Sequence, residues 1–313
     1  MRYFLLPLST RSTLLYCERN NPSRAAAATQ PSGVKPPLID RLTARANRTW
    51  VEWENVEEGT GFVRGGWKKM VTDYGNKAFR RISFEEWGLK SIPPLSTQQR
   101  QILERGESRA ILALYPGAFL KEEKVLPMLK KMATERQALH TKRLWLSVLA
   151  MPVTIPFGLI PILPNIPFFY LAFRAWSHYR ALYGSKHLEL VLAKNLVVPK
   201  PDTRLDAMYS ASLTHSTQAD AETAAMPTTQ EVSRIAGLVE QREKESGKET
   251  ILLKKWSSRV IAKRFKLPAM EIEIERAVEQ VENQLAAQES VMAEEQRRGV
   301  DQKSAIQPEK VKL

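Results

Sequence analysis

The chain has 313 residues, enough for one sizeable domain with extensions. Its 43% hydrophobic content and mean hydropathy of −0.33 exclude a carrier with many membrane spans, and its single cysteine, Cys17, excludes an internal disulfide framework. The net charge of +13 is concentrated in the first two-thirds of the chain, with 25 basic against 14 acidic residues over 1–143 and 5 against 1 over 174–200. Residues 201–313 hold 17 basic against 19 acidic residues.

The basic character narrows the class of partner. A surface rich in Lys and Arg favours anionic lipid headgroups, by about 1 kcal/mol for each nearby side chain. Nucleic acid is the rival partner for a basic protein. The sequence has no zinc-ligand spacing, RNA-binding aromatic signature or basic heptad region. We therefore expect membrane lipids as a partner and no nucleic acid.

Residues 1–19 have two interpretations. Basic and hydroxyl residues with no acid before Glu18 are typical of a mitochondrial targeting segment. The apolar run 3–8 predicts instead a short buried strand. Because Pro7 lacks an N–H, either this strand lies at a sheet edge or Pro7 lies at the end of the strand. Composition alone leaves both interpretations open.

A flexible loop is expected over 20–37, where small, polar and proline residues dominate. From 38 to 198 the pattern predicts a helical domain, because apolar residues recur near helical spacing, beginning with 38–56 and 62–81. Shorter elements follow. They are a helix or turn at 84–92, a helix at 97–105, a strand at 110–115 that could pair with residues 3–8, and an amphipathic helix at 125–139.

Thirty consecutive residues, Leu144 to Phe173, carry no charged side chain. A helix needs about 20 mainly apolar residues to cross a bilayer, so this length allows one crossing and is too short for two. Prolines interrupt the segment repeatedly, and each lacks the N–H that a helix interior requires. They are Pro152, Pro156, Pro161, Pro164 and Pro167.

The densest proline cluster predicts a turn between two half-helices. It contains Pro161, Pro164, Asn165 and Pro167, and the Asn165 side chain could satisfy backbone groups freed at the turn. Lys and Arg on both flanks favour keeping both ends on one side of the membrane. We therefore predict a proline-broken, membrane-associated hairpin over 144–173. A single span and a buried hairpin in a soluble helical domain are the alternatives.

The ends of this segment are expected at the membrane interface. Trp and Tyr beside Arg are typical of that zone. The residues that we assign to the interface are Arg143, Arg174, Trp176, His178 and Arg180.

The segment after the apolar stretch continues as a helix over 168–191. Residues 199–230 are small, polar and marked by proline, which predicts a disordered linker. Long helices are expected over 231–298: one at 231–245, a basic one at 251–265, and an acidic one that Pro268 opens. A disordered tail, 299–313, completes the prediction. The fold class is therefore mainly α-helical with a small β element.

The sequence shows no catalytic constellation, so we expect no enzymatic activity, cofactor or metal site. Its four histidines, at 140, 178, 187 and 215, lack metal-ligand spacing and a recurring carboxylate partner. The polar groups of 144–173 are Ser147, Thr154, Asn165 and the phenol of Tyr170. Proton-coupled carriers use ionisable groups within the membrane. One such segment per chain cannot enclose an ion pathway, so a self-sufficient exchanger is not expected.

Three segments are similar to one known family. They are the opening Met1–Ser9, the Leu114-Tyr115-Pro116 element, and above all the proline, asparagine and aromatic pattern from Pro152 to His178. Together they resemble the fungal mitochondrial K+-H+ exchange-related family over about residues 1–199. The resemblance implies a mitochondrial, inner-membrane protein connected with potassium–proton exchange, and an N-terminus retained as structure. It implies no catalytic residues.

Our leading hypothesis is a matrix-facing accessory protein of the mitochondrial inner membrane. It would serve K+/H+ exchange and monovalent-cation homeostasis together with a protein partner or a second copy of itself. The alternative is a membrane-bound scaffold or assembly factor with an indirect effect on potassium. A soluble helical domain without membrane contact is the third hypothesis.

Overall fold

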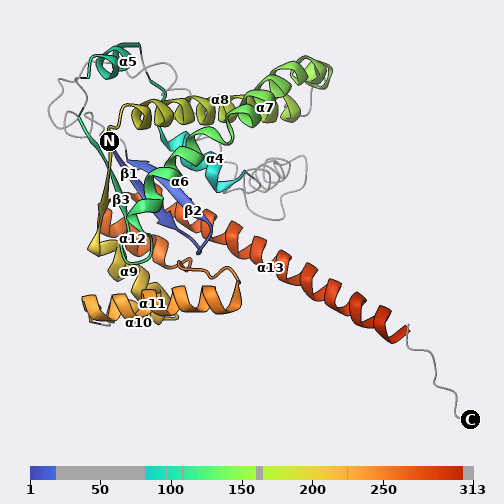
Figure 1. The fold of residues 1–313 in the computed structure, drawn as a ribbon. Coiled ribbons are helices and arrows are strands. Elements are labelled where there is room, and N and C mark those ends of the chain that lie inside the picture. The colour runs from blue at the N-terminus through green and yellow to red at the C-terminus, as the bar shows by residue number, and fades with distance from the viewer. Residues whose placement is uncertain (19–81, 96, 107–108, 160–164, 224, 306–313) are drawn as a thin grey trace, which may run out of the picture. The chain divides into compact units, whose positions relative to one another are not determined.

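The computed structural model describes residues 1–18, 82–95, 97–106, 109–159, 165–223 and 225–305 (Figure 1). Four short strands form one sheet in the order β2-β1-β3-β4. They are β1 (Arg2–Pro7), β2 (Thr13–Glu18), β3 (Ile111–Tyr115) and β4 (Val197–Pro201). The remaining elements within the described residues are helical, so the predicted fold class, mainly helical with a small β element, is confirmed.

The predicted strands at 3–8 and 110–115 correspond to β1 and β3. β1 lies between two neighbours and is buried on both faces, as its nearly continuous apolar sequence requires. Pro7 is its last residue, which is where a strand tolerates a missing N–H. β2 pairs with β1 through a tight turn, in which the Leu8 amide donates to the Ser12 carbonyl at 2.8 Å.

The chain divides into two compact units. The first comprises Met1–Tyr3, Cys17–Leu112 and Pro127–Val198, and the second comprises Phe4–Tyr16, Ala113–Leu126 and Pro199–Leu313. The helices that begin in the N-terminal two-thirds are α4 (Phe84–Ser91), α5 (Thr97–Glu104), α6 (Glu122–Thr134), α7 (Gln137–Ala150), η2 (Pro152–Leu159, a 3-10 helix) and α8 (Ile166–Ala193).

In the first unit, α4 and α7 pack against the long helix α8. Gln137 near the start of α7 donates to Glu189 near the end of α8 at 2.7 Å, so the two helices run antiparallel. Asn165 begins α8 by accepting a hydrogen bond from the Phe168 amide at 3.0 Å. Gly184 lets α4 approach α8 closely, because a Cβ at this position would lie 2.1 Å from the Leu89 carbonyl oxygen.

The second unit contains α9 (Thr203–Thr214), α10 (Gln218–Thr223), α11 (Thr229–Ser246), α12 (Ser257–Phe265) and α13 (Pro268–Ala305). The predicted helices at 231–245, 251–265 and 268–298 correspond to α11, α12 and α13, although α12 begins six residues later than expected. A reciprocal capping pair of Thr228 and Glu231 starts α11, and Gly247 ends it at φ 62°.

Two disorder predictions are wrong. Residues 199–230 contain the end of β4, α9 and α10, and Tyr209 of α9 is fully buried against the ring of Phe119. Burial of apolar side chains at helical spacing offsets the ordering entropy that was expected to keep this segment unfolded. The tail prediction is wrong for residues 299–305, because they continue α13.

Other predictions are corrected in detail or are not covered. The expected helix 125–139 is two helices, α6 and α7, which meet around Glu135 and Arg136. The loop 20–37 and the expected helices before residue 82 lie outside the described residues. Among the helices of the described residues, none is both long enough and apolar enough to cross a bilayer.

Candidate functional site

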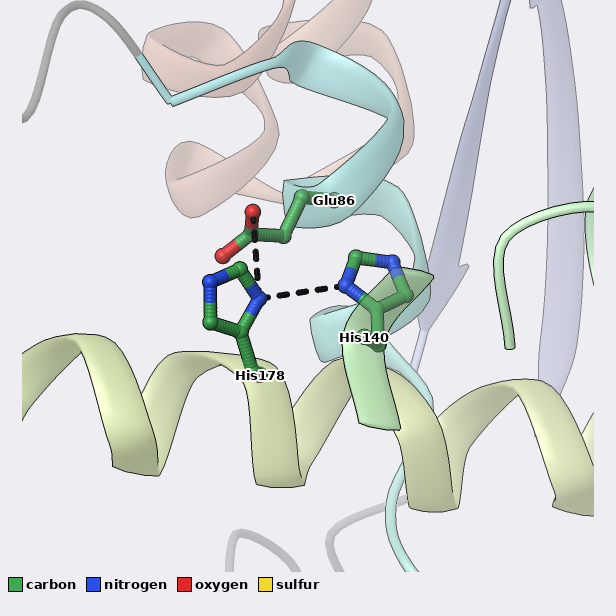
Figure 2. Close-up of side chains that lie close together, drawn as sticks. All are labelled: Glu86, His140 and His178. Atoms are coloured by element: carbon green, nitrogen blue, oxygen red, sulfur yellow. Dashed lines mark hydrogen bonds and ion pairs between the residues drawn. The ribbon is translucent and has the colours of Figure 1, made fainter. Parts of the chain in front are cut away.

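A buried cluster of charged and titratable side chains joins α4, α7 and α8 within the first unit. Its members are Glu86 of α4, His140 of α7, and Arg174, Ser177 and His178 of α8. Glu86 is 4% exposed, and His140 and His178 are each 2% exposed. Figure 2 shows the Glu86 carboxylate and the two imidazole rings turned toward one another. We call this set the buried cluster.

The helix geometry explains why these residues meet. Arg174, Ser177 and His178 occupy positions i, i+3 and i+4 of α8 and therefore share one face. The antiparallel arrangement of α7 and α8 brings His140 opposite that face, with the two ring centroids 5.4 Å apart. The short α4, held close to α8 at Gly184, presents Glu86 to the same side chains.

The Glu86 carboxylate is held as an anion by two neighbours on α8. Arg174 donates from Nη1 to Oε1 at 3.1 Å and from Nη2 to Oε2 at 3.4 Å, and Ser177 Oγ donates to Oε1 at 2.5 Å. Burial by itself would raise the pKa of Glu86. The Ser177 hydrogen bond and the charges of Arg174 and the histidines outweigh burial, so the pKa lies below its ordinary value.

The hydrogen bonds define where the histidine protons sit. Arg174 Nη2 donates to His178 Nε2 at 3.0 Å, so the proton of a neutral His178 is on Nδ1. That Nδ1 lies 3.1 Å from Nδ1 of His140, which must therefore be an acceptor and carry its own proton on Nε2. His140 Nε2 is buried and has no hydrogen-bond partner. The pair is a neutral, directed Nδ1–H···Nδ1 contact.

Both histidines resist protonation in this setting. Burial lowers the pKa of His178 to about 4; the Glu86 charge raises it but is outweighed, with Arg174 adding to the lowering. Burial likewise lowers the pKa of His140, where Arg136, Arg143 and Arg174 also oppose the Glu86 charge. At neutral pH the cluster therefore holds two neutral imidazoles beside a carboxylate paired with Arg174.

Glu86, His140 and His178 are also the residues that could hold a metal ion, because one ligand atom from each lies within 4.8 Å of the others. Two histidines and a carboxylate suit zinc or a similar divalent ion. The present contacts oppose that use. Arg174 already neutralises Glu86, and it leaves the His178 proton on Nδ1, the atom that faces the other ligands.

The predicted interface residues have different environments. Arg143 is exposed, and Trp176 is 47% exposed. Arg180 donates from Nη2 to the Lys90 carbonyl at 3.2 Å. Arg174 and His178 belong to the buried cluster, where the His178 side chain is buried away from the surface. A lipid-facing role for the exposed members stays a prediction.

The predicted turn is described in part. Pro161 and Pro164 lie outside the described residues, and Pro167 is exposed in the first turn of α8. The expected backbone role of Asn165 is confirmed. In addition to capping α8, its Nδ2 donates to the Thr154 carbonyl at 2.6 Å and ties η2 to the start of α8.

Sequence reasoning missed Glu86, His140 and Ser177. His140 and His178 are 38 positions apart, and Ser177 is 91 positions from Glu86, so no short motif links them. The one local signal was the spacing of Arg174, Ser177 and His178 on a single helical face. The expectation that the histidines lack a carboxylate partner is thereby corrected.

A second feature of this unit is an exposed apolar surface on the helical hairpin. Trp145 and Leu149 of α7, Val153 of η2 and Phe169 of α8 are 60–72% exposed. Leu146, Ile155 and Tyr170 extend the surface, with exposures of 44–61%. We call these seven residues the apolar tip. Large apolar side chains exposed together on neighbouring elements are typical of surfaces that contact a protein or a membrane.

Two curated fungal proteins are similar to this chain. An uncharacterized protein of Schizosaccharomyces pombe is 30% identical over 193 residues, which are 62% of this chain and 76% of that protein. An uncharacterized protein of Saccharomyces cerevisiae is 35% identical over 89 residues, which are 28% of each chain. No solved structure matches the chain.

The family comparison spans most of the first unit. A family model described as mitochondrial K+-H+ exchange-related matches residues 2–192, which include the buried cluster and the apolar tip. That description concerns mitochondria and ion exchange and names no enzymatic reaction. The chain belongs to the mitochondrial K+-H+ exchange-related family.

Proposed function

We propose that this protein is a membrane-associated accessory protein of K+/H+ exchange on the matrix face of the mitochondrial inner membrane. The observation that carries the proposal is the apolar tip, which lies within the family-matched residues. Full burial of a Leu, Val or Phe side chain is worth about 1.5–3 kcal/mol, so several tip residues together supply substantial membrane affinity. Exposed Lys142 and Arg143 precede the tip and would meet anionic headgroups.

An accessory role follows from the chemistry of the apolar segment. Residues 144–173 contain no carboxyl, amino, guanidinium or imidazole group, and carriers that move protons use such groups inside the membrane. The buried cluster supplies titratable groups next to this segment instead, on α4, α7 and α8. We infer that the chain contributes to exchange together with a partner or a second copy.

Vesicle flotation tests the membrane contact. The purified chain should float with vesicles that contain anionic lipid, and Leu149→Glu/Val153→Glu should reduce the bound fraction by more than tenfold, because two carboxylates would have to enter the apolar layer. The matched control is Leu238→Glu/Val291→Glu, which adds the same charge at two positions that are each 54% exposed in the second unit. Equal flotation of both double variants would contradict the proposal.

Swelling of mitochondria in potassium acetate tests the role in exchange. Mitochondria without the protein should swell slowly from the outset, and re-expression should restore the rate. Normal early swelling, followed by defects in complex assembly, would favour the scaffold alternative. Swelling of liposomes that contain this chain alone would show that it is an exchanger in its own right and would contradict the accessory role.

A further inference from the structure

A cavity in the second unit is lined by both apolar and basic side chains. Its volume is about 720 Å³, within the range of sites that hold small molecules, and it lies among α9, α10, α11 and α12. All of its lining residues fall between Ala207 and Lys266, beyond the family-matched residues 2–192. Whatever it binds therefore adds to the proposed exchange function and does not depend on it.

Part of the wall of the cavity is aliphatic. Met208 and Ala211 of α9, Met226, Ile235 of α11 and Val260 of α12 supply its aliphatic side chains, beside polar ones such as Ser210 and Thr214. Methionine side chains are flexible and adapt to ligands of irregular shape. An extended hydrocarbon chain suits such a wall better than a planar ring does.

The lining carries an excess of positive charge. Arg259 and Lys263 lie one turn apart on α12, Lys266 caps the end of that helix in the left-handed conformation, and Arg264 and Arg234 also line the cavity. Among the described residues, Lys263, Arg264 and Lys266 have no carboxylate within ion-pair distance. The one carboxylate in the described lining, Glu231, already accepts hydrogen bonds from the amide and hydroxyl of Thr228.

These observations favour one class of ligand. We propose that the cavity binds a long-chain fatty acid, with the hydrocarbon chain along the aliphatic wall and the carboxylate at Lys263 and Lys266. An unpaired cluster of cations in the lining of a partly apolar cavity is complementary to an anionic amphiphile. It is not complementary to an uncharged lipid, and a bare anion would leave the wall unfilled.

Quenching of tryptophan fluorescence by a brominated fatty acid tests the site. Trp256 lines the cavity, so dibromostearate should quench its emission, and Trp256→Phe should remove that quenching. Palmitate should compete with the bromolipid. Hexadecanol should compete at least tenfold more weakly, and inorganic phosphate should not compete. Equal competition by hexadecanol, or full competition by phosphate, would overturn the proposal.

Variants locate both ends of the ligand. Lys263→Ala/Lys266→Ala should weaken palmitate binding about tenfold, which corresponds to about 1.4 kcal/mol. The control Lys244→Ala/Lys248→Ala removes the same charge away from the cavity and should have no effect. Ala211→Trp should abolish binding by filling the cavity, with circular dichroism to verify folding.

A further control separates this cavity from the apolar tip. Leu149→Glu/Val153→Glu should leave palmitate binding unchanged. If that variant alone loses binding, the fatty acid binds at the tip, and the cavity proposal fails while the membrane proposal stands.

Discussion

Replacement of Arg174 by methionine tests the energetics of the buried cluster most directly. The substitution removes the cation that contacts Glu86 at 3.1 and 3.4 Å and keeps a long side chain that favours helix. Glu86 would then be a buried carboxylate with Ser177 as its remaining strong partner. Removing one partner of a buried pair costs about 3–5 kcal/mol, so we expect a loss of that size in the stability of the first unit at pH 7.5.

The stability that Arg174→Met loses relative to the native protein should become smaller as the pH falls. In the native cluster the pKa of His178 is lowered to about 4 from an ordinary value of 6.5, so the unfolded chain binds more protons and stability falls with falling pH. Between pH 7.5 and 5.5 this linkage costs the native protein about 1.4 kcal/mol. Without Arg174, His178 can protonate beside Glu86, whose Oε2 lies 3.8 Å away, and the variant avoids that cost.

Hydrogen exchange of the backbone amides of α4 and α8 is the suitable assay, because it reports the stability of this unit separately from the rest of the chain. Lys186→Met is the control, since it removes one charge from an exposed position of α8 and should change stability by less than about 0.5 kcal/mol. A deficit below about 1 kcal/mol for Arg174→Met at pH 7.5 would refute the reasoning. So would a deficit of the same size at pH 7.5 and pH 5.5.

Three further predictions concern the same unit. In thermal unfolding, Gly184→Ala should destabilise it by about 2 kcal/mol or more, because the added Cβ would lie 2.1 Å from the Leu89 carbonyl oxygen. The control Gly237→Ala, which places its Cβ in open space, should be neutral or stabilising by up to about 1 kcal/mol. Asn165→Ala should cost about 1–2 kcal/mol through loss of the α8 cap, and Asn165→Asp should cost less because it keeps the acceptor; equal losses would contradict the capping role. The native protein should lose stability from about pH 6.5 down to pH 4, and His178→Phe should flatten that part of the curve measured by urea unfolding.

The sequence was most informative where a local pattern determines the structure. The proline cluster that ends at Pro167 placed the start of a helix at 168, and α8 begins two residues earlier, capped by Asn165. The apolar run of β1 predicted a buried strand, and Pro268 marked the start of α13. In each case the signal lies within a few residues of the structure it specifies.

Two elements were missed although part of the signal was present. Leu205, Met208 and Tyr209 follow the i, i+3, i+4 pattern of an apolar helical face, and Asp202 before them caps α9 through the Arg204 amide. The polar composition of 199–230 concealed this face. β4 contains two prolines, which disfavour a strand, but it lies at the edge of the sheet, where an unpaired side tolerates them.

The buried cluster could not be predicted from spacing. Its members come from three helices, and the contacts between them depend on the antiparallel packing of α7 on α8 and on the close approach at Gly184. A single sequence shows which residues can titrate. It does not show which of them share a low-dielectric environment, and that environment is what shifts the pKa values.

The hairpin of β1 and β2 constrains the order in which the protein can fold. The Leu252 amide donates to the Leu8 carbonyl at 2.8 Å. The Thr250 amide donates to the hydroxyl of Thr10, which lies 240 positions earlier in the chain. These hydrogen bonds join residues 240 or more positions apart, and contacts of such long sequence separation form slowly. Before these contacts form, the apolar hairpin of β1 and β2 is without these partners and is prone to aggregate. A fragment that ends before residue 247 should for this reason be insoluble, even though it contains the whole family-matched region.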